Sequence, residues 1–574
     1  MAEIVLAAFN ARYAHTSFGA RYLLANLGEL KDRTELMEFD LQVQPRVAVE
    51  KILAHKPRIV GIGCYIWNIE LATKVAALLK SVSPETVVVL GGPETSHETE
   101  EQEIFRYADY VICGEGETEF PRLCRRVFNH KDTKNSKKGR LGAPSCSSSL
   151  RGKIIHAEPV DVAEVELPYD LYTDEDIKHR AIYVEASRGC PFRCEYCMSS
   201  LDPCVRYFPE KKLFAAFTNL LDRGARNFKF VDRTFNIDIP FALKVLGFFH
   251  ERYEPGMMLH FEVIPDRLPD ELMEAVAACP PGMLQFEIGI QTFNEEVAHR
   301  IKRPLDIEKI EANVRRLREE TGVHIHSDLI AGLPGEDLES FEAGFNRLLT
   351  LDPQEIQLGI LKRLRGAPID RHSTDWKMVY SPHAPYEILS TSQIPFEQMQ
   401  RVQRFARYWN LVVNNGQFIN TAPLIWSRRA ACDTTTVPQA AGLPEASAVP
   451  QAAGLLPDEE PVHGAAEPAV VQPNSPFAEF MAFSDWLYAT THTTGNLHMV
   501  RLAKLLLEYL VEEKGLDEKT VAEALWFDYQ RGNRPDVPGF LKPFEPKEDQ
   551  AESRRDACDT HTARLPRQAR HQKD

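Results

Sequence analysis

Short apolar segments alternate with amphipathic ones along most of this chain, and this alternation constrains the fold more than any other feature. Before residue 130, five segments rich in Val, Ile or Leu are separated by amphipathic stretches such as 18–30 and 69–82. The five segments are 4–9, 36–39, 58–66, 86–90 and 110–113. We therefore expect residues 1–130 to form a doubly wound parallel sheet of the flavodoxin-like (Rossmann-like) type, with ligands at the carboxyl ends of its strands.

The composition then changes over a short stretch. Residues 131–153 hold seven basic residues, one acidic residue and a run of serines in place of the periodic pattern. We interpret 131–180 as a linker. A solvated linker is favoured over a nucleic-acid contact, because the linker's charges need no partner other than water.

A second series of alternating segments begins near residue 181. Six apolar segments, with helical patterns such as 210–223, 269–278 and 307–321 between them, predict a partial (β/α)6 TIM-type barrel over 181–370. The predicted strands are 182–186, 227–231, 259–264, 284–290, 325–330 and 355–361. A site in such a fold is built from loops at the carboxyl ends of the strands.

The remainder of the chain differs in kind. Amphipathic helical patterns at 396–413 and 497–513 predict a mainly helical C-terminal domain over 371–546. The stretch 431–475 has no aromatic residue and repeats the heptapeptide VPQAAGL, so we expect it to be a flexible insertion. The polar tail 547–574 is expected to be disordered.

Overall composition excludes several classes of protein. The formal charge of −16 disfavours sequence-independent binding to nucleic-acid backbones, which requires a basic surface. No uninterrupted apolar run approaches the roughly 18 residues of a membrane span. We therefore expect a cytoplasmic protein without membrane or nucleic-acid partners.

Three of the 11 cysteines are grouped. Cys190, Cys194 and Cys197 follow the first predicted barrel strand with spacings of three and two intervening residues. Three thiolates on one loop can bind three irons of a [4Fe–4S] cluster and leave the fourth iron open to a substrate or cofactor. The alternative is a structural zinc site with Cys204 as fourth ligand, although such sites usually pair two CxxC hairpins.

The cysteine loop and four further motifs together resemble the radical S-adenosylmethionine (radical SAM) superfamily. The loop carries an aromatic residue, Tyr196, before its last cysteine. The further motifs are FVDRTFN at 230–236, HFE at 260–262, IGIQT at 288–292 and DLIAGLPGE at 328–336. The resemblance implies that Cys190, Cys194 and Cys197 bind a [4Fe–4S] cluster whose open iron chelates S-adenosylmethionine. Reductive cleavage of that cofactor then yields a 5′-deoxyadenosyl radical.

The same resemblance implies roles for polar and glycine residues at the strand ends. We expect six of them to contact S-adenosylmethionine: Asp232 and Thr234 at its amine, Glu262 and Gln291 at its ribose, and Gly332 and Gly335 along its adenine. Each polar residue could instead satisfy the local backbone at a strand end. No catalytic residue can be named from the sequence.

The N-terminal domain resembles the cobalamin-binding branch of these enzymes. Gly91 and Gly92 follow the fourth segment, and Gly114 and Glu115 follow the fifth, in the order found in that branch. The glycines would let the backbone approach the nucleotide tail of a cobalamin. His15 stands where a DxHxxG motif would supply the lower cobalt ligand, but its spacing departs from that motif. It is either a displaced ligand or a loop histidine that bonds the backbone.

Together the resemblances imply a cobalamin-dependent radical SAM enzyme that methylates an unknown substrate. An electron donor such as a flavodoxin or ferredoxin would then be a partner. A radical rearrangement, cyclisation or redox reaction with the same cofactors is a second reading. A zinc- or cluster-bearing protein that binds nucleic acid is a third.

Overall fold

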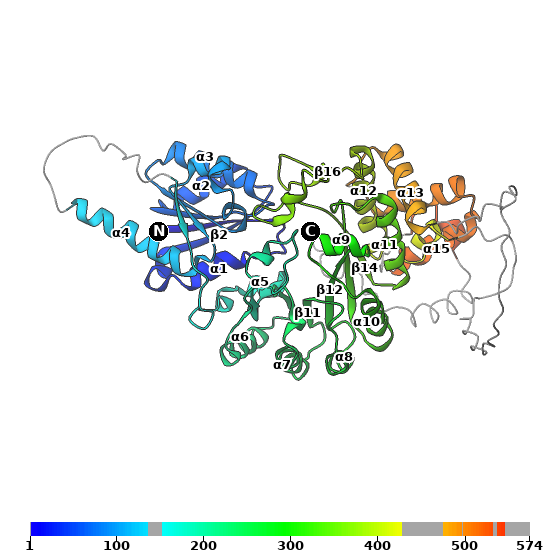
Figure 1. Cartoon of the computed structure of the whole chain (residues 1–574), viewed down its shortest axis with the longest axis horizontal. Helices are drawn as coiled ribbons and strands as arrows, with labels where there is room; N and C mark the ends of the chain where they lie inside the picture. Colours follow the sequence, from blue (N-terminus) through cyan, green and yellow to red (C-terminus); the bar gives the residue numbers. More distant parts are fainter. Residues whose placement is uncertain (1, 136–151, 428–474, 496, 532–536, 546–574) are drawn as a thin grey trace, which may run out of the picture. The chain divides into compact units, whose positions relative to one another are not determined.

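The computed structural model describes residues 2–135, 152–427, 475–495, 497–531 and 537–545 (Figure 1). The chain divides into two compact units, one running to Gly416 and one from Gln417 to Lys547, and each is described by itself. The predicted tail and nearly all of the predicted insertion lie outside the described residues, as do residues 136–151 of the predicted linker. No helix among the described residues is long and apolar enough to cross a membrane.

The N-terminal part of the first unit is a parallel sheet with strand order β2-β1-β3-β4-β5-β6. The first five strands confirm the flavodoxin-like order. They are β1 (Ile4–Asn10), β2 (Thr34–Asp40), β3 (Ile59–Gly63), β4 (Val87–Gly91) and β5 (Tyr110–Cys113). The sixth, β6 (Lys153–His156), lies in the stretch predicted as linker and pairs with β5.

Helices cover both faces of this sheet. On one face α2 (Pro45–Ala54) and α3 (Ile69–Val82) pack on the side chains of Val5, Ala7 and Phe9. On the other, α4 (Gly116–Asn135) and the segment after α1 (Phe18–Ala25) pack on Ile4 and Leu6. Successive residues of β1 thus point to opposite faces and are buried on both, which is why the strand is apolar throughout.

The second sheet of this unit has the order β14-β13-β12-β11-β10-β7, and all of its neighbouring strands are parallel. This open six-stranded arrangement confirms the partial barrel (Figure 1). The strands are β7 (Ile182–Val184), β10 (Asn227–Phe230), β11 (Met258–Val263), β12 (Leu284–Gln291), β13 (His324–Ala331) and β14 (Glu355–Ile360).

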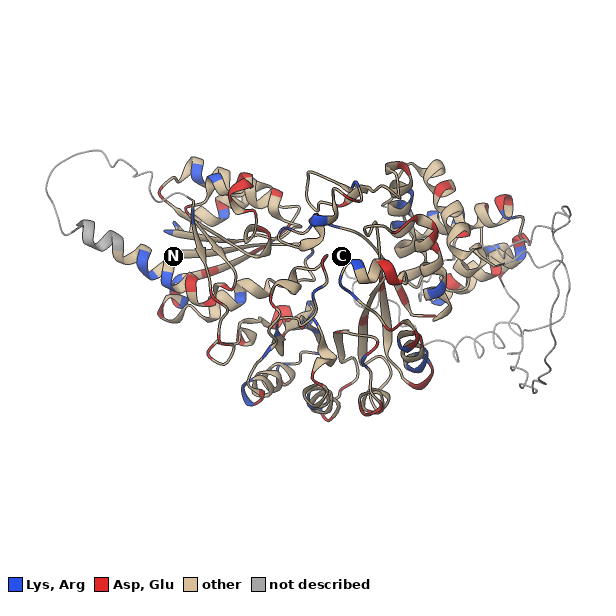
Figure 2. Ribbon diagram, viewed as in Figure 1, with Lys and Arg blue, Asp and Glu red and all other residues tan. Residues whose placement is uncertain are grey.

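Helices follow the strands around the outside of the barrel. They are α6 (Glu210–Asp222), α7 (Ile239–His250), α8 (Asp270–Ala277), α9 (Glu295–Arg300), α10 (Ile307–Glu320) and α11 (Leu338–Thr350). A short antiparallel hairpin, β8 (Ser187–Arg188) and β9 (Arg206–Tyr207), brackets the three cysteines between β7 and α6. Basic and acidic residues are intermixed over the described elements (Figure 2).

The segment after β14 packs with the barrel. It contains β15 (Val379–Tyr380), β16 (Ile388–Ser390) and α12 (Phe396–Trp409), which continues as a π-helical turn over Asn410–Asn414. Ile388 and Met399 share a buried apolar cluster with Val297 and Leu333 of the barrel. The compact units therefore divide after Gly416, whereas we expected the helical domain to begin at residue 371.

The second unit is mainly helical, as predicted. It contains α13 (Pro476–Thr491), α14 (Met499–Glu508) with a π-helical continuation over Tyr509–Glu513, and α15 (Glu518–Arg531). Asp528 on α15 is buried and accepts hydrogen bonds from the backbone and side chains of Asn420 and Thr421. This carboxylate therefore joins the start of the unit to its last long helix.

Candidate active site

The cysteine loop leaves the barrel between β8 and β9. The backbone N–H of Cys190 donates to the carbonyl oxygen of Asp202 at 2.8 Å, which closes the base of the loop. Gly189 has a φ of +92°, and a Cβ there would lie 2.2 Å from the carbonyl oxygen of Cys204. Only glycine fits this position, so Gly189 lets the two sides of the loop approach each other.

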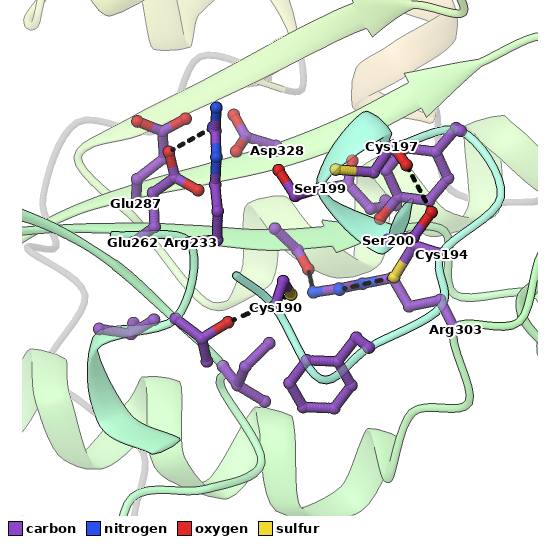
Figure 3. A pocket seen from close by; sticks show the side chains of 17 residues that line it. Cys190, Cys194, Cys197, Ser199, Ser200, Arg233, Glu262, Glu287, Arg303 and Asp328 are labelled. Carbon is purple, nitrogen blue, oxygen red and sulfur yellow. Dashed lines mark hydrogen bonds and ion pairs between the residues drawn. The ribbon is translucent and has the colours of Figure 1, made fainter. Parts of the chain in front are cut away.

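The three cysteines open onto one cavity of about 160 Å³ at the carboxyl ends of the barrel strands (Figure 3). Its walls combine thiols, guanidinium groups and carboxylates. The lining residues are Cys190, Phe192, Cys194, Tyr196, Cys197, Ser199, Ser200, Arg233, Thr234, Glu262, Val263, Ile264, Glu287, Gly289, Gln291, Arg303 and Asp328. Six of the residues predicted from the motifs are therefore brought together: three cysteines, Thr234, Glu262 and Gln291.

Three predicted polar residues line the cavity. The hydroxyl of Thr234 lies 3.7 Å from the Sγ of Cys190. Glu262 forms an ion pair of 3.5 Å with Arg233, and burial raises the pKa of its carboxyl to about 7. Gln291 has a φ of +74°, and its Oε1 is buried without a hydrogen-bond partner among the described residues. An unpaired buried acceptor of this kind is suited to a ligand that donates a hydrogen bond.

Asp232 does not line the cavity. It is buried and accepts hydrogen bonds from the backbone N–H of Ala186 at 2.9 Å and from the hydroxyl of Ser187 at 2.6 Å. Burial raises the pKa of this carboxyl to about 7. The chain direction after β10 turns Arg233 and Thr234 toward the cavity and Asp232 toward the segment that leads into the cysteine loop. In this structure, Asp232 supports that segment.

Gly332 and Gly335 also lie outside the cavity lining, and both have positive φ angles. A Cβ on Gly332 would lie 2.6 Å from the side chain of Ile388. One on Gly335 would lie 2.3 Å from the guanidinium group of Arg300. These glycines therefore admit side chains of the protein itself beside the turn after β13.

Four charged lining residues were not predicted from the sequence: Arg233, Glu287, Arg303 and Asp328. The guanidinium of Arg303 donates to the Sγ of Cys194 at 3.5 Å and to the carbonyl oxygen of Gly289 (Figure 3). Along β12, apolar residues facing the helices alternate with Gln285, Glu287, Gly289 and Gln291. That period of two in a strand covered on both faces was an available signal for an inward-facing polar row.

Buried histidines pair with two of these carboxylates. The Nε2 of His260 lies 2.8 Å from Glu287, and the Nε2 of His326 lies 3.2 Å from Asp328. Burial acts to raise the pKa of Glu287, but the hydrogen bond with His260 and nearby positive charges outweigh it and lower the pKa to about 2. Glu287 is therefore a fixed negative charge in the wall, while Glu262 titrates near neutral pH.

These residues fit a site-open cluster that chelates a zwitterionic cofactor. Three thiols share one cavity with a guanidinium group suited to a carboxylate and with an unpaired amide oxygen. Cys204, the fourth ligand of the alternative zinc site, is exposed and is not part of the lining. No group of three or more His, Cys, Asp or Glu side chains in the described residues is arranged to bind a single metal ion.

The positions predicted for cobalamin lie in loops at the carboxyl edge of the N-terminal sheet. Gly91 ends β4, and both Gly92 and Gly114 have positive φ angles, +103° and +96°. The N–H of Gly114 donates to the hydroxyl of Ser96, which in turn donates to the carbonyl oxygen of Gly92. The two glycine-bearing loops are thus joined.

Glu115 and His15 already have partners in the first unit. Both carboxylate oxygens of Glu115 accept from Arg206 at 2.9 Å. The Nδ1 of His15 lies 2.6 Å from the hydroxyl of Tyr183 on β7. Their roles at a cobalamin stay predictions.

An aromatic platform lies at the same edge of the sheet. The rings of Tyr65 and Trp67, after β3, stack with centroids 4.5 Å apart, and Trp67 is 48% exposed. A planar macrocycle can pack on such a surface. The loops and the platform therefore fit a cobalamin.

Comparison with known proteins agrees with this geometry. A family model of the radical SAM superfamily matches residues 184–348, and a model of the B12 binding domain matches residues 4–124. A protein family of unknown function, DUF4080, matches residues 374–429.

Two curated relatives are each 24% identical to the chain. One is the 2-(S-pantetheinyl)-carbapenam-3-carboxylate methyltransferase of Streptantibioticus cattleyicolor, aligned over 55% of this chain and 48% of the relative. The other is the cobalamin-dependent radical SAM methyltransferase TokK of Streptomyces tokunonensis, aligned over 53% and 47%. The chain thus spans about half the length of these relatives.

The fold is also similar to that of a solved structure. The cobalamin-dependent S-adenosylmethionine radical enzyme OxsB superposes with a TM-score of 0.56 over 95% of this chain and 83% of that one, at 12% identity. The chain therefore contains a region that matches the radical SAM superfamily and one that matches the B12 binding domain, as the motifs predicted. Its cofactors are a [4Fe–4S] cluster, S-adenosylmethionine and cobalamin.

Proposed function

We propose that this chain is a cobalamin-dependent radical SAM methyltransferase acting on a substrate still to be identified. The observation that carries the proposal is the convergence of Cys190, Cys194 and Cys197 with Arg303 and partly buried carboxylates on one cavity of the barrel. The B12 binding domain in the same chain and the methyltransferase activity of the two curated relatives support it.

We assign a distinct role to each group of residues that lines the cavity. The three cysteines would hold the cluster, and Arg303 would pair with the carboxylate of S-adenosylmethionine, since a guanidinium matches a carboxylate in shape and charge. Thr234 would accept from the amine, and Glu262 and Gln291 would accept from the ribose hydroxyls. When bound, the cluster would supply an electron, S-adenosylmethionine a 5′-deoxyadenosyl radical, and cobalamin a methyl group.

The protein's own contribution is to position these groups and to exclude water. Phe192, Tyr196, Val263 and Ile264 line the same cavity as the charged groups, so much of its wall is apolar. A closed, dry site strengthens the electrostatic contacts and prevents side reactions of a radical. We also propose a cytoplasmic location and an electron donor such as a flavodoxin or ferredoxin. No membrane or nucleic-acid partner is proposed.

The decisive experiment uses anaerobically purified full-length protein with and without hydroxocobalamin. We expect the brown absorption of a cluster and a shifted cobalamin spectrum. With dithionite and methyl-labelled S-adenosylmethionine we expect 5′-deoxyadenosine and label in a product. A colourless protein that binds zinc tightly would contradict the whole proposal. Formation of 5′-deoxyadenosine without label transfer to any candidate substrate would contradict methylation alone.

A further inference from the structure

The hairpin that carries the cluster cysteines is joined to the N-terminal domain by two arginines. Arg206 on β9 forms two parallel hydrogen bonds of 2.9 Å with the carboxylate of Glu115. Arg188 on β8 forms an ion pair of 2.8 Å with Glu117. Both glutamates belong to the loop and helix start after β5, where the sequence predicted cobalamin contacts. The cysteine loop is therefore attached at its base to a predicted cobalamin loop.

On the barrel side, the contact continues to the first cysteine. The guanidinium of Arg206 also pairs with the carboxylate of Asp202 at 2.6 Å. The carbonyl oxygen of Asp202 accepts the backbone N–H of Cys190 at 2.8 Å. Movement of Arg206 would therefore displace the residue that closes the cysteine loop.

On the side of the N-terminal domain, the Arg206–Glu115 pair is linked to both glycine-bearing loops. Glu115 follows Gly114, whose N–H donates to the hydroxyl of Ser96 at 3.2 Å. That hydroxyl donates to the carbonyl oxygen of Gly92 at 2.9 Å. A series of hydrogen bonds and ion pairs, linked by the peptide bond between Gly114 and Glu115, thus runs from Cys190 through Arg206 and Glu115 to the loop after β4.

The central pair is largely shielded from solvent. The side chains of Arg206 and Glu115 are 19% and 23% exposed, so salt screens them less than a surface pair. The bidentate geometry adds directional rigidity to the attraction. Burial acts to raise the pKa of Glu115, but Arg206 and the N–H of Val160 outweigh it and lower the pKa, so the carboxylate stays ionised.

A separate contact holds the two domains together. Arg365, after β14, pairs with Glu94 at 2.9 Å and with Glu98 at 2.6 Å. Tyr386 donates to the same oxygen of Glu94. Because this second contact is independent of the hairpin, loss of the Arg206 contact should leave the domains attached.

We propose that Arg206 is a positioning residue that couples the two cofactor sites, by holding the cluster loop in register with the loops that receive cobalamin. The inference rests on the proposed function, since it requires both cofactors to bind. Coupling between two sites is reciprocal, so cobalamin should stabilise the cluster loop as much as the cluster loop favours cobalamin.

The first test is a titration of hydroxocobalamin into cluster-loaded full-length protein, followed by absorbance. We expect Arg206→Gln to weaken binding about tenfold, within the usual range of coupling energies. Arg206→Lys should recover part of the loss, because lysine restores the positive charge but cannot form the two parallel hydrogen bonds of a guanidinium group. Arg125→Gln is the matched control, since Arg125 forms an exposed pair of 2.7 Å with Glu29 in the same domain. It should bind as the wild type does.

The second test measures the rate at which a chelator removes iron, with and without hydroxocobalamin. In the wild type, cobalamin should slow iron release about fivefold. In Arg206→Gln the two rates should be equal, a result that a merely structural role would not produce. Glu115→Gln should shift the rates in the same direction, and the double variant should lose less than the sum of the two single ones, because both changes remove the shared Arg206–Glu115 pair.

The outcomes separate this inference from the proposed function. If the wild type binds neither a cluster nor cobalamin, the proposed function fails. If it binds both, but Arg206→Gln keeps an affinity within about twofold and retains the protection of iron by cobalamin, the coupling is refuted while the function stands. Should Arg206→Gln fail to fold, Glu115→Gln provides the same comparison from the other side of the contact.

Discussion

The carboxylate of Glu195, between the second and third cluster cysteines, lies 2.8 Å from the Nε2 of His372 beyond the last barrel strand. Glu195 is fully buried and also pairs with Arg371 at 2.6 Å and Lys302 at 3.1 Å. The backbone N–H of Ile369 donates to its carbonyl oxygen. The cysteine loop is therefore held from the segment that follows the barrel as well as from the N-terminal domain.

Glu195→Gln should loosen this side of the loop. The substitution keeps the size of the side chain but removes the charge that faces Arg371, Lys302 and the imidazole of His372. Because Arg371 and Lys302 are about half exposed, we expect a loss of only about 1–2 kcal/mol, seen as a melting temperature lower by about 2–4 °C. Iron should also leave the cluster-loaded variant faster under a chelator. Unchanged melting and iron release would show that the ion pairs have no role in holding the loop.

The cysteine assignment predicts a clear contrast between two alanine variants. Cys197→Ala should lose most of its iron and form no 5′-deoxyadenosine, because one of three cluster ligands is missing. Cys204→Ala should keep both properties, since Cys204 is exposed and lies outside the cavity lining. Iron and acid-labile sulfide are measured after anaerobic reconstitution. Equal iron loss in the two variants would favour a site with four cysteine ligands.

The sequence predicted both sheets because their strands are buried on two faces and therefore read as apolar runs between amphipathic helices. It did not reveal β6, whose four residues lie beside a polar stretch. Nor did it show that β15, β16 and α12 pack on the barrel, since the two strands have only two and three residues. Long-range packing, not local periodicity, determines where such short elements lie.

Residues of the cavity lining were predicted where a motif and a strand end coincide, as at Cys190 and Gln291. Asp232 and Thr234 illustrate the limit of this reasoning. They are two residues apart just after β10, but only Thr234 lines the cavity. Beyond the end of a strand the alternation of faces no longer holds, so the orientation depends on tertiary contacts such as those of Asp232 with Ala186 and Ser187. Arg303 was missed because it follows a helix and not a strand.

Substitution of Gly289 should alter the cavity without removing a polar group. A Cβ at this position would lie 2.3 Å from the Nε2 of Gln291, the mobile end of a side chain. Gly289→Ala should therefore fold normally but displace Gln291. We expect the dissociation constant for S-adenosylmethionine to rise about tenfold, the loss of one hydrogen bond of ~1.4 kcal/mol.

The matched control is Gly359→Ala on β14, where a Cβ would meet its nearest atom at 3.4 Å. Isothermal titration of the cluster-loaded proteins measures both affinities. If Gly289→Ala binds S-adenosylmethionine as tightly as Gly359→Ala does, Gln291 has no part in holding the cofactor.

The pH dependence of stability can distinguish a structural role of Asp232 from a role in binding S-adenosylmethionine. Its pKa is raised by burial from 3.8 to about 7 in the folded chain, so the folded state binds the proton more tightly than the unfolded state. Its contribution to stability is therefore greatest at low pH and is lost as the pH rises from about 4 to about 7. Asp232→Asn cannot titrate and should melt at a lower temperature throughout, because its amide replaces one acceptor with a donor.

The difference in melting temperature between wild type and Asp232→Asn should consequently shrink as the pH rises through that window. Other titrating groups, such as Glu262, contribute equally to both proteins and cancel in the difference. Because Asp232 does not line the cavity, the affinity of Asp232→Asn for S-adenosylmethionine should stay within about twofold of the wild type wherever both are folded. A large loss of affinity with no change in melting would instead make Asp232 a ligand of the cofactor amine, as its motif suggested, and would require the segment after β10 to turn when the cofactor binds.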